Sequence, residues 1–165
     1  MRNTWFISDT HFGHKNILDY CRPHFSSLEE MEETIVSNWN AVVKPVDLVY
    51  HLGDFAWTPK DAKRVRPRLN GSIRLIVGDH DDIPALAAAG LFQRISMWRQ
   101  FRELGFTASH LPMRFDQLRH STKNLHGHVH GATEGLEAFH YDLSVESTGY
   151  APVNLDTIRS WVGPT

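Results

Sequence analysis

Short apolar runs alternate with amphipathic stretches along the first half of the chain. The runs at residues 4–8, 46–52 and 73–77 have the length of buried strands, and each is followed by aspartate or by a glycine–aspartate pair. Residues 28–43 carry apolar side chains near helical spacing, and a serine followed three residues later by a glutamate forms a capping-box pattern at their start. This alternation predicts strands separated by helices.

Two further helices are predicted before a second half that is richer in strands. A basic helix is predicted at residues 61–69, which Pro67 should end early, and an alanine-rich helix at 84–91. Beyond them we predict four strands and a closing helix, at residues 93–97, 105–109, 123–126, 139–145 and 155–162. No repeat or linker interrupts the sequence, so we predict one domain over residues 1–165. The pattern is typical of an α/β fold with two sheets face to face and helices outside.

Composition narrows the class of protein. Of the 165 residues 41% are hydrophobic and 22% charged, which is typical of a globular domain. The formal net charge of -2 argues against tight, sequence-independent binding to nucleic acid, although it leaves nucleotide substrates open. The single cysteine, Cys21, gives no disulfide within the chain. No apolar run approaches the ~20 residues of a membrane span, so we expect a cytoplasmic protein without a membrane partner.

Aspartate and histidine follow five of the predicted strands. They occur as Asp9-Thr10-His11, Gly53-Asp54, Gly78-Asp79-His80-Asp81, Ser109-His110 and Gly127-His128-Val129-His130. Ligands of open α/β sheets bind beyond the carboxyl ends of strands, so we expect these side chains to meet at one edge. If the backbone is extended, residues two apart point the same way, so Asp9 with His11, or His128 with His130, could face one pocket. Carboxylate oxygen and imidazole nitrogen suit Zn, Mn, Fe or Ni, and the ligands suffice for two ions.

This ordered set of motifs resembles that of the calcineurin-like metallophosphoesterase superfamily, in particular its small single-domain bacterial and phage members. The resemblance covers residues 9–130, and the five motifs occur in the family's order. It implies a four-layer α/β/β/α sandwich and a hydrolase of phosphate esters, with phosphodiesters the expected class. It also implies two divalent transition metals as cofactors, with Mn expected first and Ni, Fe or Zn as alternatives.

The resemblance assigns a role to each motif residue. Seven of them would ligate metal: Asp9, His11, Asp54, Asp79, His110, His128 and His130. Asp9, His11 and His130 would hold one ion. Asp79, His110 and His128 would hold the other. Asp54 would bridge both ions together with a hydroxide that attacks phosphorus directly. His80 would be the catalytic residue that contacts the phosphate and stabilises charge or protonates the leaving oxygen.

One position departs from the family pattern. Asp79 stands where the family usually has asparagine, which brings an extra negative charge and puts the metal preference and the rate in question. Taken singly, Asp9 or Asp54 could also be turn residues that bond to their own backbone, and His110 could be an ordinary loop histidine. The interpretation as ligands rests on the whole set. The sequence leaves two positions open for His14, one near the phosphate and one on the surface.

Two alternative functions remain at this stage. A nuclease acting on DNA or RNA is favoured by the basic residues between Lys60 and Arg68, although a solvated helix face explains them as well, and it is disfavoured by the net charge. A non-catalytic metal-binding scaffold with the same fold is favoured by Asp79 alone. The sequence predicts neither the physiological substrate nor the oligomeric state.

Overall fold

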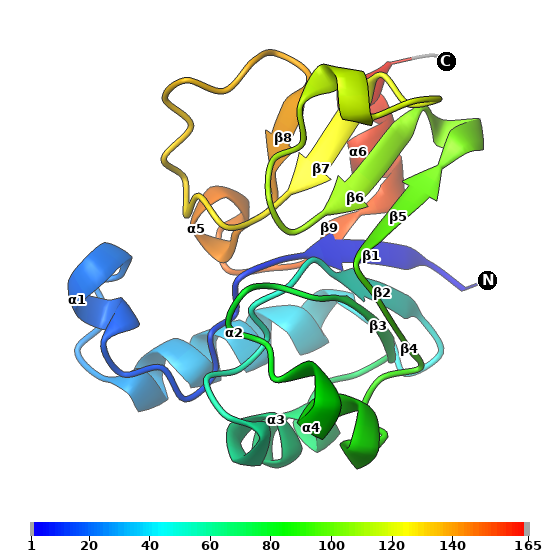
Figure 1. Cartoon of the computed structure of the whole chain (residues 1–165). Helices are drawn as coiled ribbons and strands as arrows, with labels where there is room; N and C mark the ends of the chain where they lie inside the picture. The colour runs from blue at the N-terminus through cyan, green and yellow to red at the C-terminus, as the bar shows by residue number, and fades with distance from the viewer. Residues whose placement is uncertain (1, 164–165) are drawn as a thin grey trace.

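The computed structural model describes residues 2–163, which contain two sheets (Figure 1). Apolar side chains pack between the sheets. The first sheet has the order β4-β3-β2-β1-β9, with β1 to β4 parallel and β9 antiparallel to β1. Its strands are β1 (Thr4–Ile7), β2 (Leu48–His51), β3 (Ser72–Ile76), β4 (Arg94–Ser96) and β9 (Val153–Asn154). The second sheet has the order β5-β6-β7-β8, with β5 antiparallel to β6 and the others parallel. Its strands are β5 (Trp98–Phe101), β6 (Phe106–Ser109), β7 (Lys123–His126) and β8 (His140–Asp142).

Helices α2 (Leu28–Val42), α3 (Pro59–Val65) and α4 (Ile83–Ala89) cover the outer face of the first sheet (Figure 1). Three further α-helices are α1 (Ile17–Cys21), α5 (Val145–Thr148) and α6 (Leu155–Val162), and short 3-10 turns lie at Arg66–Arg68, Arg102–Leu104 and Phe115–Gln117. None of the helices in residues 2–163 is long and apolar enough to cross a membrane. The arrangement confirms the predicted α/β sandwich.

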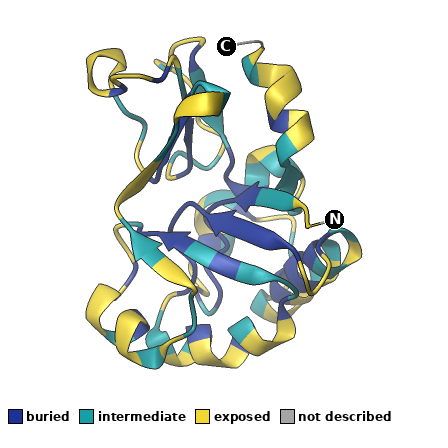
Figure 2. Ribbon diagram, turned by 90° about the vertical axis from the view of Figure 1, so that its right-hand side faces the viewer, coloured by how far each residue is buried: buried dark blue, intermediate teal, exposed yellow. Residues whose placement is uncertain are grey.

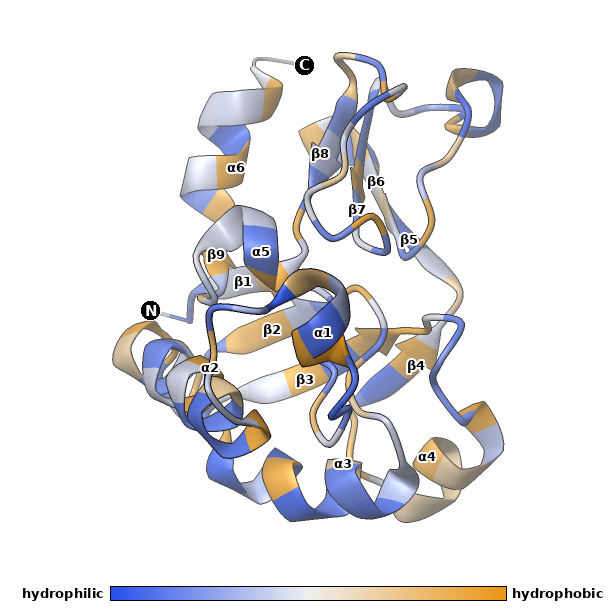
Figure 3. Cartoon of the chain, turned by 90° about the vertical axis from the view of Figure 1, so that its left-hand side faces the viewer, coloured by the Kyte–Doolittle hydropathy of each residue, from blue (hydrophilic) through white to orange (hydrophobic). Residues whose placement is uncertain are grey.

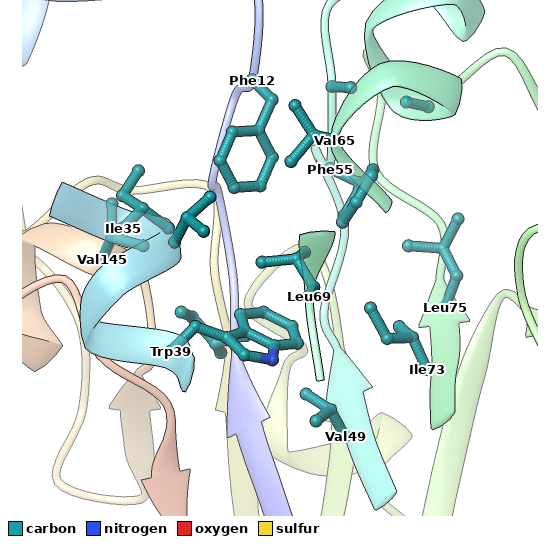
Figure 4. Packing of buried hydrophobic residues seen from close by; sticks show 14 of the residues in the cluster. Phe12, Ile35, Trp39, Val49, Phe55, Val65, Leu69, Ile73, Leu75 and Val145 are labelled. Atoms are coloured by element: carbon teal, nitrogen blue, oxygen red, sulfur yellow. The ribbon is translucent and has the colours of Figure 1, made fainter. Parts of the chain in front are cut away.

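Alternation along the strands of the first sheet divides the core into two parts. On β1, Ile7 packs toward the helices while Phe6 packs toward the second sheet, as expected for side chains that alternate between faces. The central strand β2 is buried at every position, whereas the outer helices alternate between buried and exposed residues (Figure 2). Figure 4 shows Trp39 of α2 in the outer part, with Val49 and Leu69 nearby. Burial of each such large side chain contributes roughly 1.5–3 kcal/mol.

Local sequence signals set the helix boundaries. The predicted capping box forms at α2, where the Ser27 hydroxyl accepts a hydrogen bond from the backbone N–H of Glu30. The basic helix begins earlier than predicted, because Thr58 caps it and Pro59 occupies its first turn. The α-helix ends before Pro67, and a 3-10 turn continues the chain to Arg68. The pattern therefore located this helix but missed its first residues.

The second half differs more from the sequence prediction. The predicted strand at 93–97 is β4, which ends at Ser96 and pairs with β3 in the first sheet. The predicted strand at 139–145 is shorter, because α5 begins at Val145. Helices α1 and α5 and strands β5 and β9 were not predicted. The outward face of the second sheet is polar at Thr107 and Asn124, and the loop 110–121 hydrogen-bonds to both side chains.

Candidate metal centre

The predicted motif residues come together where the carboxyl ends of both sheets meet. Those from the first sheet follow β1, β2 and β3, and those from the second follow β6 and β7: Asp9, His11, Asp54, Asp79, His80, His110, His128 and His130. Helix α1 lies in front of the first sheet at this edge (Figure 3). Strand ends from two sheets thus supply one cluster of oxygen and nitrogen donors.

The backbone carries these side chains in an unusual conformation. Positive φ occurs at Asp9 (58°), His11 (49°), Asp54 (56°), His128 (69°) and His130 (50°). These are five of the seven non-glycine residues with positive φ in the described part of the chain. Such conformations are sparsely populated, cost of order 1–3 kcal/mol each and gather at functional sites. The backbone is therefore not extended through the Asp9–His11 and His128–His130 segments, so the condition under which each pair would face one pocket is not met.

One group of possible ligands consists of Asp9, His11 and His130. Their donor atoms lie within 4.8 Å of one another. Asp9 Oδ1 is 3.8 Å from His11 Nε2 and 3.6 Å from His130 Nε2. The first two residues follow β1 and the third follows β7, so the group joins the two sheets.

A second group consists of Asp79, His110 and His128, with donor atoms again within 4.8 Å of one another. Asp79 Oδ1 is 2.9 Å from His110 Nε2 and 3.1 Å from His128 Nδ1. The His110 Nδ1–H donates a hydrogen bond of 2.9 Å to the carbonyl of Leu52, so Nε2 is the ring nitrogen that faces the group. His128 and His130 thus belong to different groups instead of facing one pocket together.

The Asp54 carboxylate lies between the two groups. Its Oδ2 is 3.4 Å from His11 Nε2 and 3.6 Å from His110 Nε2. Its Oδ1 accepts a hydrogen bond of 3.1 Å from the backbone N–H of His80. Asp54 is therefore within reach of both groups and also anchors the start of the His80 side chain.

The buried donors of the first group fit a divalent cation. Both ring nitrogens of His11 are buried and have no hydrogen-bond partner among the described residues, whereas buried polar atoms are nearly always paired. Burial lowers the pKa of His11, so its ring stays neutral with a lone pair to offer. Burial likewise raises the pKa of Asp9 to about 6, a cost to the carboxylate that an adjacent cation would offset. Oxygen and imidazole donors of this kind suit divalent transition metals.

Glycines before the motif residues allow the close approach of these segments. A Cβ built on Gly78 would overlap the Asp54 carboxylate, and one built on Gly127 would overlap the Asp9 carboxylate. A Cβ on Gly53 would overlap the ring of His110. Each glycine of the G-D and G-H motifs therefore makes room for a candidate ligand from another strand.

His80 is more exposed than the buried donors, although one of its ring nitrogens lies within 4.8 Å of carboxylate oxygens of Asp54 and Asp79. Its side chain is 42% exposed, and its Nε2 lies 3.7 Å from Asp79 Oδ2. It lines a hollow of about 520 Å³ together with His14, Tyr20 and Trp57. The His14 ring stacks on Trp57, with centroids 4.0 Å apart and planes 8° from parallel. His80 thus faces a space that a substrate could enter.

Two residues that the sequence analysis missed support the first group. The Glu146 carboxylate accepts a hydrogen bond of 2.7 Å from Arg22 Nε and lies 2.9 Å from His130 Nδ1. The fully buried Arg22 guanidinium also donates to the backbone carbonyls of Thr10 and Asp9. Burial would raise the pKa of Glu146, but the hydrogen bond with His130 and the charge of Arg22 outweigh it and lower the pKa to about 2.

This arrangement orients His130 by the nitrogen opposite the candidate metal position. Glu146 is on α5, beyond the last motif in the sequence, and Arg22 directly follows α1. Neither belongs to a periodic or spaced pattern, so the sequence offered no signal for them. Cys21 lies beside the same pair, with its Sγ 3.5 Å from Glu146 Oε1.

Comparisons with known proteins agree with this geometry. The chain is 36% identical over 169 residues to an uncharacterized protein of Methanocaldococcus jannaschii, an alignment that covers 96% of this chain and 90% of that protein. It is also 36% identical over 88 residues to the gene 66 protein of Mycobacterium phage L5, covering 49% of this chain and 41% of that protein. A solved structure of a protein of unknown function from Aquifex aeolicus matches with a TM-score of 0.80 and 27% identity, covering 97% of this chain and 99% of the other.

The family itself is identified by a model of calcineurin-like phosphoesterases, which matches residues 2–142. This range includes all five motifs and both groups of possible ligands. The match confirms the resemblance inferred from the motifs and implies divalent metal ions and a phosphate-ester substrate. The chain belongs to the calcineurin-like phosphoesterase family.

Proposed function

We propose that this chain is a phosphodiesterase that uses two manganese ions. The main support is the pair of candidate groups, each with one aspartate and two histidines, and the Asp54 carboxylate between them. In this proposal, Asp9, His11 and His130 would hold one ion and Asp79, His110 and His128 the other, with Asp54 available to both. Two divalent ions, when bound, supply positive charge to phosphate oxygens and lower the pKa of a water molecule, so no covalent enzyme intermediate is required.

The protein's own residues would position the substrate and move a proton. His80 lines the hollow of about 520 Å³, where its ring could reach an ester oxygen of a bound substrate, and a hydrogen bond from its backbone N–H to Asp54 holds its backbone in place. We assign it the role of stabilising charge on the phosphate or protonating the leaving oxygen. A general acid of this kind is worth about 10²–10⁴-fold in rate.

Charge supports a diester over a monoester. Asp9, Asp54 and Asp79 bring three negative charges, so two divalent ions leave a net charge of one positive before any water ionises. A phosphodiester carries one negative charge near neutral pH, whereas a monoester carries close to two. The more weakly charged substrate matches the smaller charge of this site.

The proposal is tested with bis(4-nitrophenyl) phosphate and 4-nitrophenyl phosphate, offered to metal-free protein supplied with Mn, Ni, Zn or Mg. We expect release of 4-nitrophenol from both, with higher kcat/KM for the diester and the highest rates in Mn. Asp54→Asn should abolish turnover, while the matched exposed variant Asp116→Asn should retain it. A faster monoester would overturn the diester assignment. No turnover with any metal would favour the non-catalytic scaffold instead.

The basic stretch gives a nuclease little support in the folded protein. Arg68 pairs with Glu33 at 2.7 Å and Arg64 pairs with Glu32 at 2.7 Å. Arg66 donates hydrogen bonds to the backbone carbonyls of Leu69, Gly71 and Leu91. These guanidinium groups are occupied by structural partners, so they do not form a free track for nucleic acid.

A further inference from the structure

A second hollow adjoins the candidate metal centre on the side of Asp79. Its volume is about 360 Å³, within the range of roughly 300–1,000 Å³ that small-molecule sites occupy. The wall is apolar and includes Val77, Ile83, Met97, Trp98, Leu111 and Met113. Asp79 and His110 of the second ligand group form the end of the hollow nearest the centre.

The side chains of this hollow are unusually exposed for their type. Met97, Trp98 and Leu111 are more than half exposed, and Ile83 is 40% exposed. They come from separate places: the β4–β5 junction, the residue after His110, and the first residue of α4. Exposed apolar side chains that gather around one hollow of this volume suit a small-molecule site.

Both hollows border the cluster of candidate ligands, and they are lined by different residues. Asp54 and His80 line the larger hollow with Trp57, whereas Asp79 lines the apolar one. Asp79 and His80 are consecutive residues, so the boundary between the hollows falls at the candidate centre itself. The phosphorus atom of a diester is tetrahedral and carries two ester groups, the arms, which point in different directions. A site for a diester therefore needs space on two sides, and a monoester needs it on one.

We propose that the apolar hollow binds one ester arm of a phosphodiester and that this arm is an uncharged aromatic or aliphatic group. The inference rests on the proposed phosphodiesterase function and narrows its substrate class. In residues 2–163, no lysine or arginine lines the hollow, and the Asp79 carboxylate at its end repels an anionic arm. The indole of Trp98 offers a flat surface to a ring. The second arm lies in the larger hollow, beside His80.

Kinetics with three substrates of identical leaving group test the inference. Bis(4-nitrophenyl) phosphate has an aryl second arm, methyl 4-nitrophenyl phosphate has a small one, and 4-nitrophenyl phosphate has none. The ratio of kcat/KM for the bis-aryl diester to that for the methyl diester should fall roughly tenfold in Trp98→Ala, and further with Leu111→Ala added. Trp161→Ala removes another exposed tryptophan on α6, which stacks on Tyr141 away from the hollow, and should leave the ratio unchanged.

A binding measurement does not depend on turnover. Methionine methyl groups labelled with ¹³C report on the hollow through Met97 and Met113. Met31, fully buried between the first sheet and the outer helices, is the reference. In zinc-loaded protein, millimolar diphenyl phosphate should shift the first two signals and leave Met31 in place. Dimethyl phosphate, which has the same charge, should shift neither.

The possible failures are distinguishable. An unchanged substrate ratio in Trp98→Ala, or unshifted Met97 and Met113 signals, would overturn the apolar-arm proposal while hydrolysis of the diesters still supports the phosphodiesterase. Loss of the Met97 signal on raising the protein concentration alone, with a doubled mass in light scattering, would also overturn it in favour of a second copy of this chain. Absence of hydrolysis of all three substrates would overturn the proposed function itself.

Discussion

The two candidate metal groups contain the same kinds of donor atoms in different surroundings. In the first group the side chains of Asp9, His11 and His130 are 0%, 2% and 20% exposed. In the second, Asp79 and His128 are 50% and 43% exposed, and His110 alone is buried, at 3%. The first group also has the buried Arg22 and Glu146 behind it, whereas the apolar hollow adjoins the second.

We infer from this difference that the first group would hold its ion more tightly, whereas the second group would lie more open to a substrate. Buried, oriented ligands lose little freedom when they bind metal, and water competes poorly for them. Half-exposed ligands can exchange their ion and leave room for a phosphate oxygen. We therefore expect one tightly held and one more exchangeable ion per chain. Metal content near two after loading with excess Mn, and near one after extended desalting, would fit; consistently less than one would not.

The largest expected effect sharpens the role of the open side. His80→Ala should lower turnover by about 10²–10⁴-fold while metal content stays near that of the parent, because His80 is assigned to proton transfer and not to the ligand set. Steady-state kinetics and elemental analysis of the same samples check this. His120→Ala, a change at an exposed histidine, is the control for both measurements. Metal lost in proportion to activity would place His80 among the ligands.

A second change breaks the support of the buried side. Arg22→Met should destabilise the fold by about 3–5 kcal/mol, because it removes the guanidinium from a nearly buried carboxylate and leaves Glu146 only its contact with His130. Urea unfolding of the metal-free protein measures the loss. The matched variant Arg68→Met breaks an exposed pair with Glu33 and should cost no more than about 1 kcal/mol. Equal costs would show that the buried ion pair has no special role.

A milder change at the same place should separate the two groups. Glu146→Gln weakens the hydrogen bond to His130, so metal affinity of the first group should fall about 10–100-fold and that of the second should not change. Competition with a chromogenic chelator resolves the two affinities, and the exposed variant Glu134→Gln serves as control. A uniform loss at both positions would contradict separate support for the first group.

The smallest of these effects concerns Asp79. One charge at roughly 6 Å in an effective dielectric of about 20 is worth about 3 kcal/mol, and half exposure of the carboxylate reduces this. Asp79→Asn should therefore weaken metal binding at the second group and raise turnover per bound metal about tenfold. Kinetics at saturating Mn with metal content measured in parallel decide the matter. Equal or lower turnover in the fully loaded variant would reject the charge argument.

The sequence predicted the fold class and the members of the motifs because both leave local signals. Strand-length apolar runs and a capping serine mark the elements, and polar residues directly after strands mark the edge where ligands gather. The sequence could not predict the left-handed backbone at Asp9 and His130, since neither residue type requires it. Arg22 and Glu146 gave no signal, because their pairing depends on how α1 and α5 dock, and tertiary contacts alone determine that.

Each candidate group draws ligands from both sheets, and this has a mechanical consequence. Asp9 and Asp79 belong to the first sheet, while their partners His130 and His110 belong to the second. An ion bound by either group would cross-link the two halves of the sandwich, and would also be lost if they separated. Occupancy and folding are then thermodynamically linked: each ion at a hundred times its Kd adds about 2.7 kcal/mol to the free energy of unfolding. For this protein, a shortage of metal in its surroundings would lower resistance to unfolding as well as the rate of reaction.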